Sequence, residues 1–189
     1  MPKKVDPIAR RAEILDAAVR VFARKGFAAS RIEDVAAEAG IAKGSVYLTF
    51  DSRDALLTGV FDAYNDRAAH VLTELGAGSG LDRLAELIRR TVAMLDAHPD
   101  HARVLLDVWA AKPPMDIAAV YREYRNAIAD LLRQARDEGE LRPGIGDEHA
   151  AVIVGAIEGC LLQSLADADM PLAALAEPIV RICVDGVRR

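Results

Sequence analysis

The stretch SRIEDVAAEAGIAKGSVYLTF, residues 30–50, decides how the first part of the chain folds. Apolar residues follow Ser30 at helical spacing, and serine is a residue type that favours the start of a helix. Glu33 stands three residues later, a spacing that predicts a capping box. Gly40 lies where the chain must reverse, because glycine tolerates the positive φ that such a turn needs. We therefore expect one short helix, a tight turn, and a second short helix over residues 43–49.

The second expected helix has an apolar inner side and a polar outer side. Val46 and Phe50 are its inward anchors, whereas Lys43 can reach a phosphate or a guanine edge. Such an element suits insertion into the major groove of DNA, although an ordinary helical hairpin with a polar face is the alternative. The candidate DNA-binding residues are Ser30, Arg31, Lys43, Gly44, Ser45, Tyr47, Leu48, Thr49 and Arg53.

The first third of the chain resembles the TetR family of transcriptional regulators. The matching residues are Arg11, Ile14, Leu15, Ala17, Ala18, Phe22, Gly26 and Phe27, then 32–36, 39–41, 43–47 and Phe50, and finally 52–56. Two positions depart from the family's commonest pattern: Ala42 stands where the helix cap is usually serine or threonine, and Thr49 where an aromatic residue or histidine is frequent. The resemblance implies an all-α fold of about nine helices. A helix-turn-helix DNA-binding domain is expected over residues 1–52, and an effector-binding and dimerisation domain over residues 53–189.

Composition and charge agree with a DNA-binding protein that has a separate acidic part. The chain of 189 residues is 52% hydrophobic and carries a net charge of −5. Residues 1–54 nevertheless hold ten Lys or Arg against eight Asp or Glu. No apolar segment opens the chain and no apolar run approaches the roughly 20 residues of a membrane span, so we expect a cytoplasmic protein. Cys160 and Cys183 are expected to be free thiols, and no cofactor is expected.

The segment 150–165 predicts a homodimer. Its only polar side chains are Glu158, Gln163 and Ser164, and a helix that is apolar on every side is expected to be buried on every side. One face can pack on its own chain and the other on a second copy; a central helix of a monomer is the alternative. The candidate interface residues are Ile153, Ala156, Gly159, Cys160, Leu162, Val180 and Val184.

The family resemblance also implies a cavity for a small effector. Large side chains on the inward sides of the expected helices would surround it, with a carboxylate and an amide to orient the ligand. The alternative is that these residues are simply core. The candidate effector-binding residues are Phe61, Tyr64, Met94, Trp109, Tyr121, Tyr124, Glu158 and Gln163.

Together these features predict a dimeric repressor that a small molecule releases from a near-palindromic operator. The repressor role comes from the resemblance, and the residues do not exclude an activator. Asp96, His98, Asp100 and His101 raise the alternative of a metal-responsive regulator, although a solvated corner between helices explains them equally. A DNA-binding architectural protein without an effector is another alternative. No catalytic motif stands out, so we expect no enzymatic activity and no bound metal.

Overall fold

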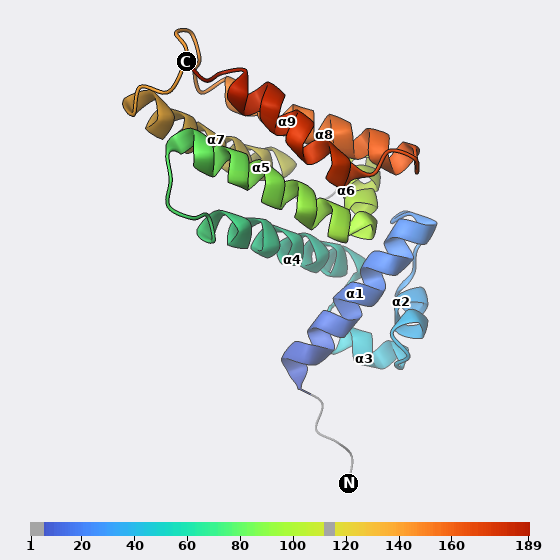
Figure 1. Cartoon of the computed structure of the whole chain (residues 1–189). Helices are drawn as coiled ribbons and strands as arrows, with labels where there is room; N and C mark the ends of the chain where they lie inside the picture. Colours follow the sequence, from blue (N-terminus) through green and yellow to red (C-terminus); the bar gives the residue numbers. More distant parts are fainter. Residues whose placement is uncertain (1–5, 112–115) are drawn as a thin grey trace. The chain divides into compact units, whose positions relative to one another are not determined.

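The computed structural model describes residues 6–111 and 116–189, and this part of the chain is α-helical (Figure 1). Its helices are α1 (Pro7–Lys25), α2 (Ile32–Glu38), α3 (Lys43–Tyr47), α4 (Arg53–Thr73), α5 (Gly80–Ala97), α6 (Pro99–Ala111), α7 (Ile117–Asp137), α8 (His149–Ala166) and α9 (Ala176–Val180). A 3-10 turn, Leu172–Leu175, precedes α9, and a π-helical turn, Arg181–Asp185, follows it. The predicted all-α fold is confirmed.

The chain forms two compact units. The first contains residues 1–66 and 100–115, and the second contains residues 67–99 and 116–189. The functional boundary expected after residue 52 falls within the first unit, because the start of α4 packs with the N-terminal helices. Leu56 and Leu57 of α4 are buried there, as is Val104 of α6. The boundary between DNA-binding and effector-binding functions stays a prediction.

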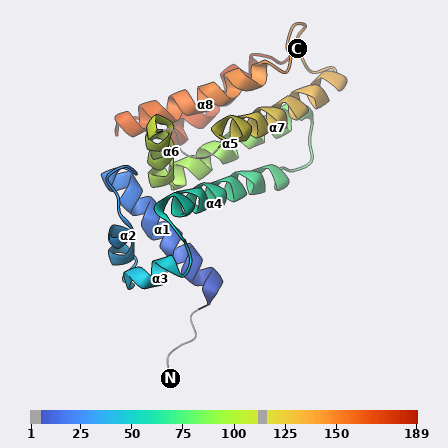
Figure 2. The same ribbon diagram turned by 180° about the vertical axis from the view of Figure 1, so that it is seen from behind.

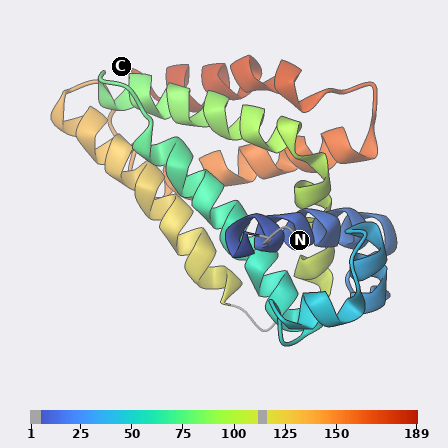
Figure 3. The same cartoon turned by 90° about the horizontal axis from the view of Figure 1, so that it is seen from below.

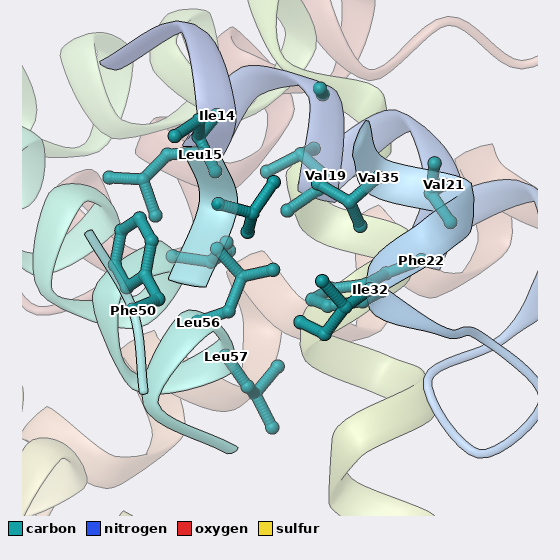
Figure 4. Packing of buried hydrophobic residues seen from close by; sticks show 14 of the residues in the cluster. Ile14, Leu15, Val19, Val21, Phe22, Ile32, Val35, Phe50, Leu56 and Leu57 are labelled. Carbon is teal, nitrogen blue, oxygen red and sulfur yellow. The ribbon is translucent and has the colours of Figure 1, made fainter. Parts of the chain in front are cut away.

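The first unit is built around α1. Figure 3 shows α1 lying beside α2 and α3, and Figure 4 shows the apolar side chains between them. Ile14 and Phe22 of α1, Val35 of α2 and Leu56 of α4 lie in this cluster with 1% exposure or less. Phe22 also meets Phe27 edge-on, with ring centroids 5.3 Å apart. The core therefore fixes α2 and α3 on one side of α1.

The loop between α1 and α2 is held by a side chain from much later in the sequence. The carboxylate of Asp107 on α6 accepts a hydrogen bond of 2.6 Å from the backbone N–H of Phe27. Gly26, at φ +77°, ends α1, and a Cβ built on it would come within 3.5 Å of the same carboxylate. Residues of α6 are thus an integral part of the N-terminal unit.

Aspartate caps α1, whereas the cap predicted for the next helix is wrong. Asp6 accepts a hydrogen bond from the N–H of Ile8 at the start of α1, as expected for an Asp-Pro start. The cap of α2 is Arg31 rather than Ser30, since the carboxylate of Asp34 accepts from the Arg31 N–H at 3.0 Å. Ser30 instead donates from its hydroxyl to the carbonyl of Gly26 at 2.6 Å, so it closes the end of α1.

A similar displacement occurs at α8. Asp147 is a residue type that favours a helix cap, but it lies one residue outside the helix, whose cap position is Glu148. Asp147 forms an ion pair with Arg133 of α7 at 2.5 Å. The carboxylate of Asp147 therefore pairs with a neighbouring helix and does not cap α8.

In the second unit, α5 packs against α7 and α9, and α7 packs against α8. Figure 2 shows α5, α7 and α8 running close to one another. Gly80 permits the closest approach, because an added Cβ would lie 2.4 Å from the backbone nitrogen of Ala135 and 2.6 Å from the carbonyl oxygen of Leu131. Leu84 and Ile88 of α5 and Leu132 of α7 are fully buried in this unit.

Candidate nucleic-acid interface

Helices α2 and α3 form the tight hairpin that the sequence predicts. Gly40 has φ +66°, the left-handed conformation expected at the turn. The N–H of Ile41 then donates to the carbonyl of Ala36 at 3.0 Å, which closes the reversal. Ala42 takes the cap position of α3 in an extended conformation without a side-chain cap bond, as its methyl group dictates.

The buried side of α3 fixes which residues face outward. Val46 is completely buried and Phe50 is 4% exposed, so this side of the helix rests on the core. Lys43 and Gly44 are exposed, and Tyr47 and Leu48 are 44% and 89% exposed. A Cβ added to Gly44 would meet nothing within 4 Å, so the surface is open beside it. Ser45 and Thr49 lie half-buried at the flanks.

Lys43 is already engaged within the hairpin. Its ammonium lies 2.5 Å from a carboxylate oxygen of Glu33 on α2 and 5.7 Å from the centre of the Tyr47 ring. The hydrogen bond from Lys43 lowers the pKa of the Glu33 carboxyl, and the same bond raises the pKa of Lys43. Both groups stay charged at neutral pH. A phosphate that binds Lys43 must therefore compete with Glu33.

The other carboxylates of α2 hold basic residues of α1. Asp34 lies 2.6 Å from the ammonium of Lys25. Glu38 accepts from Arg20 at 2.7 Å and from Arg24 at 3.1 Å. These hydrogen bonds lower the pKa of the Asp34 and Glu38 carboxyls. The acidic residues of α2 thus neutralise much of the positive charge on the neighbouring helix.

Two of the predicted DNA-binding residues have structural contacts in this unit. Ser30 is 1% exposed, which leaves it little surface to offer DNA. Arg53 donates from Nη1 to the carbonyls of Phe27, Ala28 and Ser30, at 3.2, 3.1 and 2.9 Å. Its guanidinium also lies 4.3 Å from the centre of the Phe27 ring. The structure therefore brings Arg53 to the loop before α2.

The candidate effector-binding residues are distributed over both units. Phe61 is 6% exposed in the core of the first unit, and Tyr64 is half-buried on the same helix. The side chain of Trp109 lies outside the described part of the structure. Met94 and Tyr124, in the second unit, are half-buried. Gln163 is exposed and donates to the carbonyl of Gly159 in its own helix at 3.1 Å.

The structure joins the candidates Tyr121 and Glu158 directly. The hydroxyl of Tyr121 on α7 donates to the carboxylate of Glu158 on α8. Burial raises the pKa of the Glu158 carboxyl, whereas the bond from Tyr121 lowers it, and the burial effect is the larger. The pair offers a polar contact within an otherwise apolar helix surface.

Helix α8 keeps a large apolar surface that its own chain leaves uncovered. Val152 is 66% exposed and Leu162 is 54% exposed, while Ile182, in the turn after α9, is 75% exposed. An added Cβ at Gly155 or Gly159 would meet nothing within 4 Å. In contrast, three predicted interface residues face the chain's own core, since Ile153, Val180 and Val184 are at most 4% exposed. The sequence pattern did not single out Val152 or Ile182.

Length and composition alone would allow α8 to cross a membrane. It has 18 residues, of which 22% are buried within the chain. Helices that pack against other protein share this length and composition, and Glu158 lies near the middle of α8. Among the described residues, no group of three or more His, Cys, Asp or Glu side chains could hold a metal ion.

Comparison with known proteins points to the family that the sequence resembles. A family model for bacterial regulatory proteins of the tetR family matches residues 14–60, which include the whole hairpin. The uncharacterized HTH-type transcriptional regulator YfiR of Bacillus subtilis (strain 168) is 30% identical over 143 residues, which cover 71% of this chain and 69% of YfiR. This chain belongs to the TetR family. It is a transcriptional regulator, and its relatives are regulators rather than enzymes.

This chain is also similar to a named repressor and to a regulator whose structure holds an acyl-CoA. The HTH-type transcriptional repressor KstR2 of Mycobacterium tuberculosis (strain ATCC 25618 / H37Rv) is 30% identical over 146 residues, which cover 72% of this chain and 71% of KstR2. The crystal structure of FadR from Bacillus subtilis in complex with stearoyl-CoA superimposes with a TM-score of 0.76. It covers 93% of this chain and 98% of FadR at 23% identity, a likeness that shows the fold.

Proposed function

We propose that this TetR-family regulator is a homodimeric repressor that binds a near-palindromic operator and leaves it when a small organic effector binds. The observation that carries the DNA-binding part is the outer side of α3, where Lys43, Gly44, Tyr47 and Leu48 are exposed on a helix anchored by Val46. A short helix presented in this way fits the major groove. The repressor role is supported by the likeness to KstR2, which is named as a repressor.

The dimer is proposed from the uncovered apolar surface of α8. Val152 and Leu162 remain exposed on α8 in the isolated chain, as does Ile182 after α9, and extended apolar surface of this kind commonly marks a protein interface. Gly155 and Gly159 would allow a partner helix to approach closely. In a two-fold dimer, two copies of α3 would enter successive major grooves about 34–36 Å apart.

The dimer is tested with Leu162→Glu, because this position is exposed and a charge there should leave the folded chain intact. We expect light scattering to give the mass of a monomer, and operator affinity to fall because the two half-sites are no longer bound together. Ala93→Glu is the matched control, since Ala93 is exposed on α5 and distant in sequence from the proposed interface. A dimer that survives Leu162→Glu would place the interface elsewhere.

The effector is proposed to contact the second unit, where Met94, Tyr121, Tyr124 and Glu158 lie. The FadR complex with stearoyl-CoA supports an organic ligand, because that protein shares the fold. Phe61, Tyr64, Trp109 and Gln163 stay predictions for the same role. We further propose that the protein acts in the cytoplasm, where its operator is accessible.

A thermal-shift screen joined to DNA binding tests this function. Purified protein is titrated with duplexes from its own upstream region at low ionic strength, and then with organic candidates that include long-chain acyl-CoA thioesters. A ligand that raises Tm and also releases DNA supports the proposal. DNA binding without any ligand response would favour the architectural alternative, and stabilisation by transition metals alone would favour a metal sensor.

A further inference from the structure

Leu48 is the most exposed large apolar side chain in the described part of the protein, at 89%. A single exposed leucine is not unusual by itself. The position of Leu48 is what distinguishes it, since it directly follows α3 among Lys43, Gly44 and Tyr47. Those residues form the surface to which we assign DNA binding, and the inference below rests on that proposed function.

The fold points Leu48 directly away from the core. Its backbone is still helical, with φ −69° and ψ −15°, and its N–H donates to the carbonyl of Gly44 at 3.1 Å. Because each helical residue turns by about 100°, Leu48 lies about 200° around the axis from Val46. Val46 is completely buried, and Phe50, one turn further on, is 4% exposed. These two anchors on the inner side therefore fix Leu48 on the outermost line of the helix.

The chemistry of the groove decides what an apolar side chain at that place can contact. Base edges in the major groove present hydrogen-bond donors and acceptors, and the one apolar group among them is the 5-methyl group of thymine. Leucine can form no hydrogen bond with the polar edges, but it gains free energy when it removes a methyl group from water. Gly44, one turn earlier, has no side chain, and the space beside it is open. A base edge can therefore approach Leu48 along this side of α3.

We propose that Leu48 is a specificity-determining residue that recognises one thymine in each operator half-site through its 5-methyl group. The phosphate contacts of Lys43 and Tyr47 would set the register of the helix without reading sequence. Leu48 would then add discrimination at a single base pair. Leu48→Ala would relax the preference for thymine at that position and leave the other positions unchanged.

The experiment removes the methyl group from the DNA. Operator duplexes are first selected from a random pool by the purified protein, and each thymine is then replaced in turn by deoxyuridine. Fluorescence anisotropy gives Kd for the wild type, Leu48→Ala and Leu48→Met. Burial of one methyl group contributes about 0.8 kcal/mol, which is roughly a fourfold change in Kd per half-site. At one thymine position we expect that loss with the wild type and with Leu48→Met, and less than a twofold change with Leu48→Ala.

The outcomes separate this inference from the function on which it rests. If the protein selects no duplex, the proposed DNA-binding function fails and Leu48 loses its role with it. If a duplex is selected but deoxyuridine has no effect at any position, DNA binding stands and the role of Leu48 is refuted. An equal deoxyuridine effect in the wild type and in Leu48→Ala also refutes it, because another residue then contacts the methyl group. Circular dichroism checks that the variants keep the helical content of the wild type.

Discussion

Replacing Arg53 by alanine should destabilise the N-terminal unit without removing a phosphate contact. The guanidinium joins α4 to the loop before α2, where its Nη1 lies 2.9–3.2 Å from the carbonyl oxygens of Phe27, Ala28 and Ser30. It also stacks 4.3 Å from the centre of the Phe27 ring. The sequence places Arg53 among the candidate DNA-binding residues, whereas these contacts favour a role in positioning the loop before α2.

The size of the effect follows from these contacts. Nη1 carries two hydrogens, so three carbonyls share two strong hydrogen bonds at any moment. A hydrogen bond from a charged donor contributes about 1.5–3 kcal/mol, and we take about 1 kcal/mol each because Arg53 is half-exposed. Stacking on Phe27 adds about 0.5–1 kcal/mol. The free energy of unfolding should therefore fall by about 2–3 kcal/mol, and Tm by roughly 5–10 °C.

Two measurements together test the assignment. Thermal unfolding followed by circular dichroism gives the change in Tm, with Arg53→Lys as the control that keeps the charge but loses the planar fork and the stacking. The salt dependence of operator affinity gives the number of phosphate contacts, since each contributes a slope of about 0.9 in log Kd against log salt. We expect Arg53→Ala to leave this slope unchanged. An unchanged Tm with a salt slope reduced by about 1 would refute the structural role and indicate that Arg53 contacts a DNA phosphate.

Lys43→Ala should lower the salt slope of operator binding by about 1, because it removes a predicted phosphate contact. Glu33→Gln should tighten binding at low salt, because it removes the carboxylate that competes for the same ammonium; unchanged affinity in both variants would place α3 away from DNA. Gly80→Ala should cost about 1–3 kcal/mol of stability, since its Cβ would lie 2.4 Å from the nitrogen of Ala135. Gly44→Ala is the control in chemical denaturation, because its Cβ meets nothing within 4 Å; equal stability of the two variants would contradict the tight packing of α5 on α7.

The hairpin could be predicted from sequence because its signals are local. Gly40 at the turn and Val46 and Phe50 on the inner side are fixed by backbone conformation and helical spacing, and the structure has all three as expected. The predicted cap at Ser30 failed because a second local hydrogen bond competes for that side chain. Ser30 and Arg31 are both adjacent to the start of α2, and the choice between them depends on the Gly26 carbonyl that takes the Ser30 hydroxyl. Helical spacing cannot rank two neighbouring positions when a hydrogen bond to the preceding turn competes for one of them.

The apolar surface of α8 shows where the sequence pattern loses its resolution. In a helix that is apolar on all sides, the sequence does not distinguish the side that faces the core from the side that faces outward. The pattern therefore predicted Ile153 as an interface residue, whereas its side chain is buried in the chain's own core. The exposed side of α8 can be identified only from the structure, where α5, α7 and the turn Leu172–Leu175 pack against the other side. Leu162 was selected by the pattern and is exposed, whereas Val152 and Ile182 needed the structure.

The ion pairs of α2 limit how much affinity charge alone can give this DNA-binding surface. Glu33, Asp34 and Glu38 already pair with basic side chains, so a phosphate at Lys43 exchanges one anion for another. Such an exchange yields only the difference between two similar attractions, and salt screens both. Discrimination between operator and other DNA must then come from contacts that have no counterpart in the free protein. Leu48 meets this condition in the proposed complex, because its side chain is 89% exposed in the free protein. We therefore expect weak binding to DNA that lacks the operator sequence.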